Sequence, residues 1–228
     1  MQSEKDMETT IKTLGDIARA NPAATRVFLR HHLDFCCGGQ RSLAEACSLA
    51  GLDPAAIAGE IDAEGADHGD LSVWEARSQT ELADHIEERY HARLRRDLPS
   101  LIAAAVRVEK VHAGKPDVPV GLGDLLSSFW DEMQAHMGKE ENVLFPMLRR
   151  GARGQAVYMP VRMMEQEHDA HGETLARIRQ LTGDLRAPAH ACATWTALYR
   201  GLEALEVDLM HHIHLENNIL FLRAVRGE

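Results

Sequence analysis

The chain has 228 residues, of which 45% are hydrophobic and 26% are charged, a mixture typical of globular proteins. Its net charge of −10 argues against nonspecific nucleic-acid binding, which depends on clustered Lys and Arg. The longest strongly apolar stretches, such as 101–106, are too short to cross a membrane, and the polar N-terminus lacks the apolar region of a signal peptide. We therefore expect a cytoplasmic protein.

Residues 1–63 are predicted to form a small helical domain, and 64–77 lack clear periodicity and are predicted to be a linker. Asn21 followed by Pro22 is typical of a helix start, because Asn caps free N–H groups and Pro fits the first turn. Gly51 is well placed to end a further short helix.

Residues 78–228 show four long helical patterns, and no sustained alternation of the kind that indicates β-strands. Ser78 and Glu81 fit a capping box at the start of the first pattern. Short connections make consecutive helices antiparallel, so the predicted fold class is all-α, an up-down-up-down four-helix bundle preceded by the small helical domain. The four patterns run at about 78–112, 121–150, 157–182 and 188–224.

Apolar positions in these helices recur in alternating steps of three and four residues, the seam that faces the core of a bundle. Histidines interrupt this seam, and in the second and fourth helices each is followed by a glutamate one turn later, on the same face. In the first, less regular helix the seam would include Leu82, His85 and then Arg89. The predicted seam of the second helix consists of Leu122, Leu126, Phe129, Met133, His136, Glu140, Val143 and Met147.

A buried glutamate is costly without a partner, and a bound metal lets the carboxylate stay ionised while each imidazole stays neutral. The order His, His-x-x-x-Glu, His, His-x-x-x-Glu has a twofold repeat, which predicts two metal ions bridged by the carboxylates and by an oxo or hydroxo group. Mixed nitrogen and oxygen ligands suit iron or manganese better than structural zinc, and we favour iron. The predicted ligands are His85, His136, Glu140, His168, His212 and Glu216.

Other polar groups near the predicted ligands are less specific. His171 lies on the seam one turn after His168, so it is interpreted either as an alternative ligand or as a group behind the ligands. Glu132 and Glu167 border the ligands and are candidates for proton transfer or ligand support, although an exposed position is favoured for Glu167. The histidines interpreted as ordinary solvated or hydrogen-bonded residues are His31, His32, His68, His91, His112, His190, His211 and His214.

Five segments of the chain are distinctive: "LDFCCGGQRSL" at 33–43, "DHIEERYH" at 84–91, "HMGKEENVLFPM" at 136–147, "MEQEHDAHG" at 164–172 and "HIHLENNILF" at 212–221. Through these segments the whole chain resembles the RIC (repair of iron centres) family, the hemerythrin-like di-iron proteins of the YtfE, ScdA and DnrN type. It implies a hemerythrin-like bundle with a non-haem di-iron centre on the six ligands above, and carboxylates near that centre that match Glu132 and Glu167. His171 departs from the family pattern, which has a small or neutral residue there.

The resemblance also implies a function in repairing iron–sulfur clusters damaged by nitrosative or oxidative stress, with damaged iron–sulfur proteins as clients. Binding or slow reduction of nitric oxide at the centre is a second implied activity, and dioxygen is a further candidate ligand. A scavenger or sensor of nitric oxide without repair activity stays open as the alternative. The layout leaves room for a homodimer.

Cys36 and Cys37 are the candidates for thiol chemistry, because repair requires electrons or iron to move. Two glycines follow the pair, so we expect it in an exposed turn, where it could exchange electrons or hold iron transiently; a pair of ordinary thiols is the alternative. Cys47 and Cys192 are interpreted as buried small residues.

Overall fold

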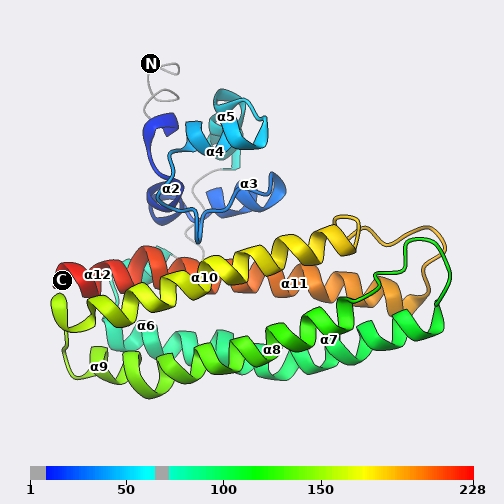
Figure 1. Ribbon diagram of the computed structural model, residues 1–228. Helices are drawn as coiled ribbons and strands as arrows, with labels where there is room; N and C mark the ends of the chain where they lie inside the picture. Colours follow the sequence, from blue (N-terminus) through cyan, green and yellow to red (C-terminus); the bar gives the residue numbers. More distant parts are fainter. Residues whose placement is uncertain (1–8, 65–71) are drawn as a thin grey trace. The chain divides into compact units, whose positions relative to one another are not determined.

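The computed structural model describes residues 9–64 and 72–228, and these are helical with no strand among them (Figure 1). The predicted all-α class is therefore confirmed. Much of the predicted linker, 65–71, lies outside the described residues, and Ser72–Glu75 forms the 3-10 helix η1. The chain packs as two compact units, Met1–Leu82 with Met210–Glu228, and Ala83–Leu209.

Four long helical rods form the predicted antiparallel bundle, and α8 packs against both α7 and α10. The capping box at the start of the first rod is confirmed, since Ser78 N–H donates to Glu81 Oε2 at 2.9 Å and Glu81 N–H donates to Ser78 Oγ at 3.1 Å. The rods are α6 (Gln79–His85), η2 (Ile86–His91) and α7 (Ala92–Val111); α8 (Leu122–Lys139), η3 (Glu140–Leu144) and α9 (Phe145–Arg149); α10 (Gln155–Leu181); and α11 (Ala193–Leu215), η4 (Glu216–Leu220) and α12 (Phe221–Arg226).

Three of the rods contain a π-helical turn: η2, η3 and η4. Such a turn carries an extra residue, and π turns inside α-helices are frequent at functional sites. In the second rod the prediction that Val143 and Met147 follow Glu140 in the core is wrong. Val143 is 50% exposed, whereas Leu144 and Leu148 are each 1% exposed, because the extra residue of η3 moves the buried positions one place along.

The uninterrupted helix α10 keeps the predicted register. Its seam residues are all buried, as expected for a regular heptad pattern. They are Val161, Met164, His168, His171, Leu175 and Ile178.

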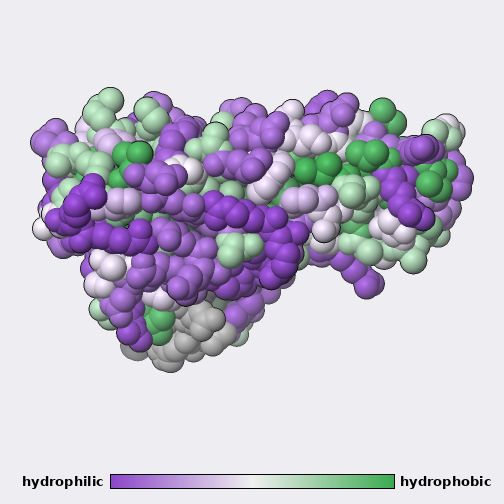
Figure 2. Space-filling view, turned by 90° about the horizontal axis from the view of Figure 1, so that it is seen from below, coloured by the Kyte–Doolittle hydropathy of each residue, from purple (hydrophilic) through white to green (hydrophobic). Residues whose placement is uncertain are grey.

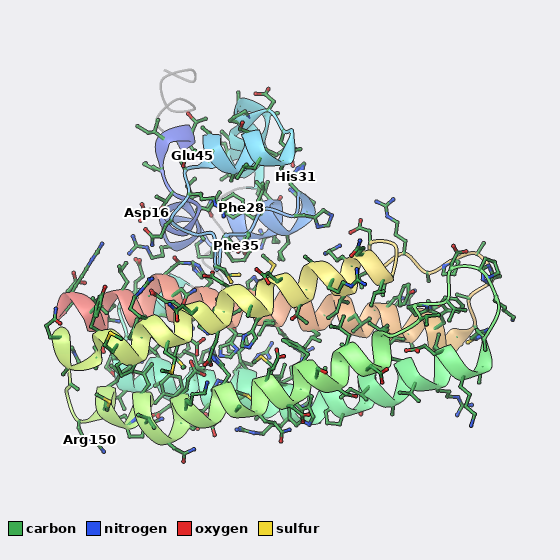
Figure 3. The ribbon with its side chains drawn as sticks, in the orientation of Figure 1. Asp16, Phe28, His31, Phe35, Glu45 and Arg150 are labelled. Carbon is green, nitrogen blue, oxygen red and sulfur yellow. The ribbon has the colours of Figure 1, made fainter. Side chains whose placement is uncertain are left out.

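In the unit that contains the N-terminal segment, short helices pack around a core that includes Phe28 and Phe35, whose ring centroids lie 5.8 Å apart (Figure 3). The expected helix start at Asn21 is wrong: Asn21 ends α2, and its side chain accepts from Ala23 N–H in the turn before α3. Gly51 ends α4 in the left-handed conformation, as expected. These helices are α2 (Leu14–Ala20), α3 (Ala24–Arg30), α4 (Leu43–Ala50) and α5 (Pro54–Glu64).

The same unit includes the end of the fourth rod, where two asparagine side chains of η4 form hydrogen bonds with the cysteine segment; these bonds are called the polar tie. The side-chain amide of Asn218 donates to the carbonyl of Phe35 at 3.0 Å, and that of Asn217 donates to the carbonyl of Cys36 at 3.2 Å. Gly15 and Gly39 leave room for Asn218, since a Cβ at either position would lie 2.6 to 2.8 Å from its Oδ1 atom. The cysteine segment is thus fastened to η4.

Hydrophilic residues predominate on the face of the molecule shown in Figure 2. Within the described parts of the chain, we find no helix with the length and apolar character needed to span a membrane.

Candidate metal centre

Glu140 is a carboxylate residue in the apolar interior of the bundle. Its side chain is completely buried, and neither carboxylate oxygen has a hydrogen-bond partner among the described residues. Its Oε2 atom lies 3.3 Å from Nε2 of His91 and 3.4 Å from Nε2 of His136. A buried carboxylate without hydrogen bonds carries a large desolvation cost, and a cation bound at this position would remove it.

His136 and His168 present two ring nitrogens to each other. Their Nε2 atoms are 3.1 Å apart, and the ligand atoms of His136, Glu140 and His168 all lie within 4.8 Å of one another. Two nitrogens at right angles around an ion, each about 2.1 Å away, would be about 3 Å apart. The separation therefore fits two imidazoles that share one metal ion.

The carboxylates of Glu167 and Glu141 orient the imidazoles of His136 and His91, respectively. Nδ1 of His136 lies 2.9 Å from Oε2 of Glu167, and Nδ1 of His91 lies 2.7 Å from Oε1 of Glu141. With Nδ1–H donated to a carboxylate, Nε2 is left with a lone pair directed toward Glu140, the arrangement common for metal-binding histidines. The hydrogen bond with His136, and then the contacts with Lys139, lower the pKa of Glu167 to about 2 despite partial burial.

Glu141 has a matching environment and was not identified from the sequence. Its hydrogen bond with His91, together with Arg95 and against partial burial, lowers the pKa of this carboxyl group. Nζ of Lys139 contacts Glu167, and the guanidinium of Arg95 donates to Glu141 Oε2 at 2.8 Å. The imidazoles of His136 and His91 are therefore each in contact with a carboxylate, and each of these carboxylates is in turn paired with a Lys or Arg side chain.

The structure does not place the predicted ligand His85 among the clustered ligand atoms. His85 is half-buried and stands edge-on to Tyr90, with ring centroids 5.6 Å apart, and it belongs to neither cluster of ligand atoms around Glu140. His91, interpreted from the sequence as an ordinary histidine, is completely buried beside Glu140. The π turn η2 is the cause: Ile86 and His91 are five residues apart, one π turn, so His91 takes the inward position.

In the other unit, His212 and Glu216 repeat the motif of His136 and Glu140. Both are buried, and Nε2 of His212 lies 3.0 Å from Oε1 of Glu216. Glu216 begins η4 just as Glu140 begins η3. The sequence repeat thus corresponds to a repeated local geometry, a π turn that starts at the glutamate.

The remaining candidates occupy different environments. Glu132 is exposed, so the structure gives no support to a role in proton transfer at the centre. Glu167 is partly buried and bonded to His136, and the exposed position favoured for it is not observed. His171 is buried, with its ring centroid 4.9 Å from that of His136 and 5.6 Å from that of Phe129.

The cysteine pair is less accessible than expected, because Cys36 is buried and Cys37 is half-buried. The two form no disulfide with each other, and their Sγ atoms lie 3.7 Å apart. Asp34 Oδ1 accepts from the N–H of Cys37 at 2.9 Å and from the thiol of Cys36 at 3.2 Å. Contact with the Cys37 thiol, burial and the Asp34 carboxylate all raise the pKa of Cys36, which is therefore a protonated thiol at neutral pH.

Two known protein families match the sequence of this chain. The family described as Hemerythrin HHE cation binding domain matches residues 82–224, and the family described as Domain of Unknown function (DUF542), ScdA_N, matches residues 10–64. The first match covers both His-x-x-x-Glu motifs, and the second covers the cysteine pair.

Proteins of similar sequence match over almost the full length. The iron-sulfur cluster repair protein YtfE of Yersinia pseudotuberculosis serotype O:1b (strain IP 31758) is 45% identical over 222 residues, which are 97% of this chain and 100% of that protein. The protein of the same name from Yersinia pestis (strain Pestoides F) has the same identity and the same coverage. The chain therefore belongs to the RIC (repair of iron centres) family of hemerythrin-like proteins.

Proposed function

We propose that this protein holds a pair of iron ions in the bundle and takes part in the repair of damaged iron–sulfur clusters. The observation that carries the proposal is the buried Glu140 carboxylate, which lies between the Nε2 atoms of His91 and His136 and has no hydrogen bond among the described residues. The names of the similar Yersinia proteins support the repair function, and the cation-binding family supports the metal.

The proposed ligand set differs from the one expected from spacing only in the first helix, where His91 replaces His85. Glu140 would serve both ions, because its Oε2 atom lies 3.3 Å from Nε2 of His91 and 3.4 Å from Nε2 of His136. We place Glu216 in the equivalent bridging role because its motif repeats that of Glu140. The proposed ligands are His91, His136, Glu140, His168, His212 and Glu216.

When bound, two iron ions would supply one-electron redox chemistry and open positions for a diatomic ligand such as nitric oxide or dioxygen. The protein's own contribution is to exclude water and to fix the ligands. On the second rod, the residues near His136 and Glu140 in sequence are also buried: Met133, Met137 and Leu144 are each 1% exposed or less. Glu141 and Glu167 hold His91 and His136 as the tautomer with a free Nε2 lone pair.

The cysteine pair is proposed to take part in repair rather than in binding small gases. The sulfur atoms of Cys36 and Cys37 and a carboxylate oxygen of Asp34 lie within 4.8 Å of one another, an arrangement that suits transient binding of an iron ion released from or delivered to a client. The raised pKa of Cys36 would favour release, because protonation of the thiol competes with iron. The four cysteines are free thiols, in keeping with the proposed cytoplasmic location.

A repair assay separates repair from nitric oxide scavenging. The purified protein would be mixed with a nitrosylated iron–sulfur dehydratase, and recovery of dehydratase activity would be followed together with nitric oxide consumption and nitrous oxide release. We expect wild-type protein to restore activity, and Cys36→Ser with Cys37→Ser to consume nitric oxide normally but to restore little activity. Equal restoration by the double variant would remove the cysteines from the proposal, and consumption of nitric oxide without restoration by wild-type protein would favour a scavenger.

Substitution is preferable to deletion of the N-terminal domain. Residues of that domain pack with the end of the fourth rod, where Asn218 donates to Phe35 and Asn217 to Cys36. Removing residues 1–60 would expose these groups next to Glu216. Cys36→Ser replaces the thiol with a hydroxyl group, which can still donate a hydrogen bond to Asp34, so the sulfur atom is the group that is lost.

A further inference from the structure

A second chemically distinctive cluster lies in the unit Ala83–Leu209, at the end of the bundle where the α7–α8 and α10–α11 connections lie (Figure 1). It consists of His112, at the end of α7, and Cys192, directly before α11. Nε2 of His112 lies 3.2 Å from Sγ of Cys192. Neither residue has a part in the metal centre, and both were interpreted as ordinary residues from the sequence.

His112 is held in place by packing. Its side chain is 5% exposed, and its ring centroid lies 5.0 Å from that of Trp195, which is completely buried. Nδ1 of His112 has no hydrogen-bond partner among the described residues, so the contact with the thiol is the polar interaction that the structure shows for this ring. A buried imidazole with one nitrogen directed at a half-buried sulfur is the geometry of a base beside a nucleophile.

The first turn of α11 adds a second source of stabilisation for a thiolate. The carbonyl of Cys192 accepts from Thr196 N–H at 3.0 Å, so Cys192 occupies the capping position directly before α11. The backbone N–H of Trp195, followed by the N–H and hydroxyl of Thr194, lowers the pKa of the Cys192 thiol. The pKa of Cys36 is raised instead, by the Cys37 thiol and by burial, and burial likewise raises the pKa of Cys47.

We propose that Cys192 is a reactive thiol site that forms mixed disulfides with low-molecular-weight disulfides, with His112 as the base. In this step the Cys192 sulfur attacks one sulfur of the disulfide, the S–H proton passes to Nε2 of His112, and the second sulfur leaves as a thiolate that takes a proton from solvent. A new S–S bond forms as the old one breaks, so Cys192 is oxidised and the leaving sulfur is reduced. Attack by a second small thiol reverses the modification.

A metal site is a weaker interpretation of the same pair. His112 and Cys192 provide two ligand atoms, and no cluster of three or more ligand atoms includes them in the part of the chain that the structure describes. Zinc sites in proteins use three or four protein ligands. The pair therefore fits thiol chemistry better than metal binding.

The test uses the full-length protein and 4,4′-dithiodipyridine, a small neutral disulfide whose thione product absorbs light. The reaction is stopped at intervals, and mass spectrometry locates the label. We expect Cys192 to be labelled before Cys36 and Cys47. We also expect Cys192 to react faster at pH 6 in the folded protein than in the same protein unfolded in urea, because only the folded state lowers its pKa.

Matched variants isolate the role of His112. His112→Asn is expected to slow labelling of Cys192 by about tenfold, which corresponds to the loss of about one pKa unit of thiolate stabilisation. His190→Asn is the control. His190 contacts the same Trp195, with ring centroids 5.7 Å apart, whereas the imidazole that contacts Cys192 Sγ is that of His112. Circular dichroism checks the folding of both variants. Equal rates in the two variants, or slower labelling in folded than in unfolded wild-type protein, would overturn the proposal.

Discussion

Nε2 of His91 lies 3.3 Å from Oε2 of Glu140, and both side chains are completely buried. Both residues belong to π turns, His91 at the end of η2 and Glu140 at the start of η3. Nε2 of His136 approaches the same oxygen at 3.4 Å. One carboxylate oxygen thus lies close to two imidazoles, which is the local basis for the proposed centre of two ions.

The first prediction separates the two histidines of the first rod. His91→Ala should lower iron content from about two ions per chain to one or fewer, because a buried ligand next to Glu140 is lost. His85→Ala should keep the wild-type content, since His85 lies against Tyr90 outside the cluster. Iron analysis of both variants after identical purification is the measurement. Loss of iron in His85→Ala but not in His91→Ala would contradict the assignment.

The second prediction concerns Glu141, which positions His91 through Nδ1 at 2.7 Å. Glu141→Gln should weaken iron binding about 10- to 100-fold, the usual effect of removing a carboxylate behind a ligating histidine. Competition with a coloured iron chelator measures this affinity. Exposed Glu132 provides the matched control, and Glu132→Gln should bind iron as wild-type protein does. Equal affinity of the two variants would show that Glu141 does not position the ligand.

The third prediction concerns acid stability of the metal-free protein. The pKa of Glu167 falls from 4.5 to about 2 on folding, chiefly because of the hydrogen bond with His136. Its stabilising contribution is therefore complete above pH 4.5 and is lost as the pH falls toward 2. Urea unfolding should show that Glu167→Gln loses less stability than wild-type protein over this interval. The same pH dependence in both proteins would show that the Glu167 contact is absent in solution.

The fourth prediction tests the polar tie in the unit that contains Phe35. A Cβ at Gly39 would lie 2.7 Å from the carbonyl oxygen of Phe35 and 2.8 Å from Oδ1 of Asn218. Gly39→Ala should therefore lower the free energy of unfolding by about 1–3 kcal/mol, the usual cost of overpacking.

Gly59 in α5 provides the contrast. A Cβ at Gly59 would meet no described atom within 4 Å beyond its own helix, so Gly59→Ala should raise stability by up to about 1 kcal/mol. Thermal unfolding of both variants checks the difference, and a Gly39→Ala protein as stable as wild type would contradict the close approach.

Much of the architecture could be predicted from the sequence, because amphipathic periodicity and caps are local signals. The capping box at Ser78, the left-handed end at Gly51 and the seam of α10 all follow from spacing and residue type. His136, Glu140 and His168 were also found in this way, since each interrupts an apolar seam, and the structure brings them together.

The two errors of register, in the first and second rods, share one physical cause. A heptad seam has a constant period, and a π turn adds a residue that helix propensity does not reveal. The predicted core positions therefore fail just after Glu140, at Val143, and in the first rod His91 rather than His85 lies buried beside Glu140. Glu141 was missed for a different reason: it lies off its own seam, and its contact with His91 joins residues 50 apart in the chain.

Metal analysis of protein purified without added metal, together with Mössbauer spectroscopy of wild-type and Glu140→Gln protein, decides whether the bundle holds a pair of iron ions at Glu140. We expect about two iron ions per wild-type chain with the spectrum of a coupled pair, and loss of that pair in Glu140→Gln, because the shared carboxylate would no longer bind both ions. A wild-type protein without iron, or a Glu140→Gln variant that keeps an unchanged pair, would contradict the account.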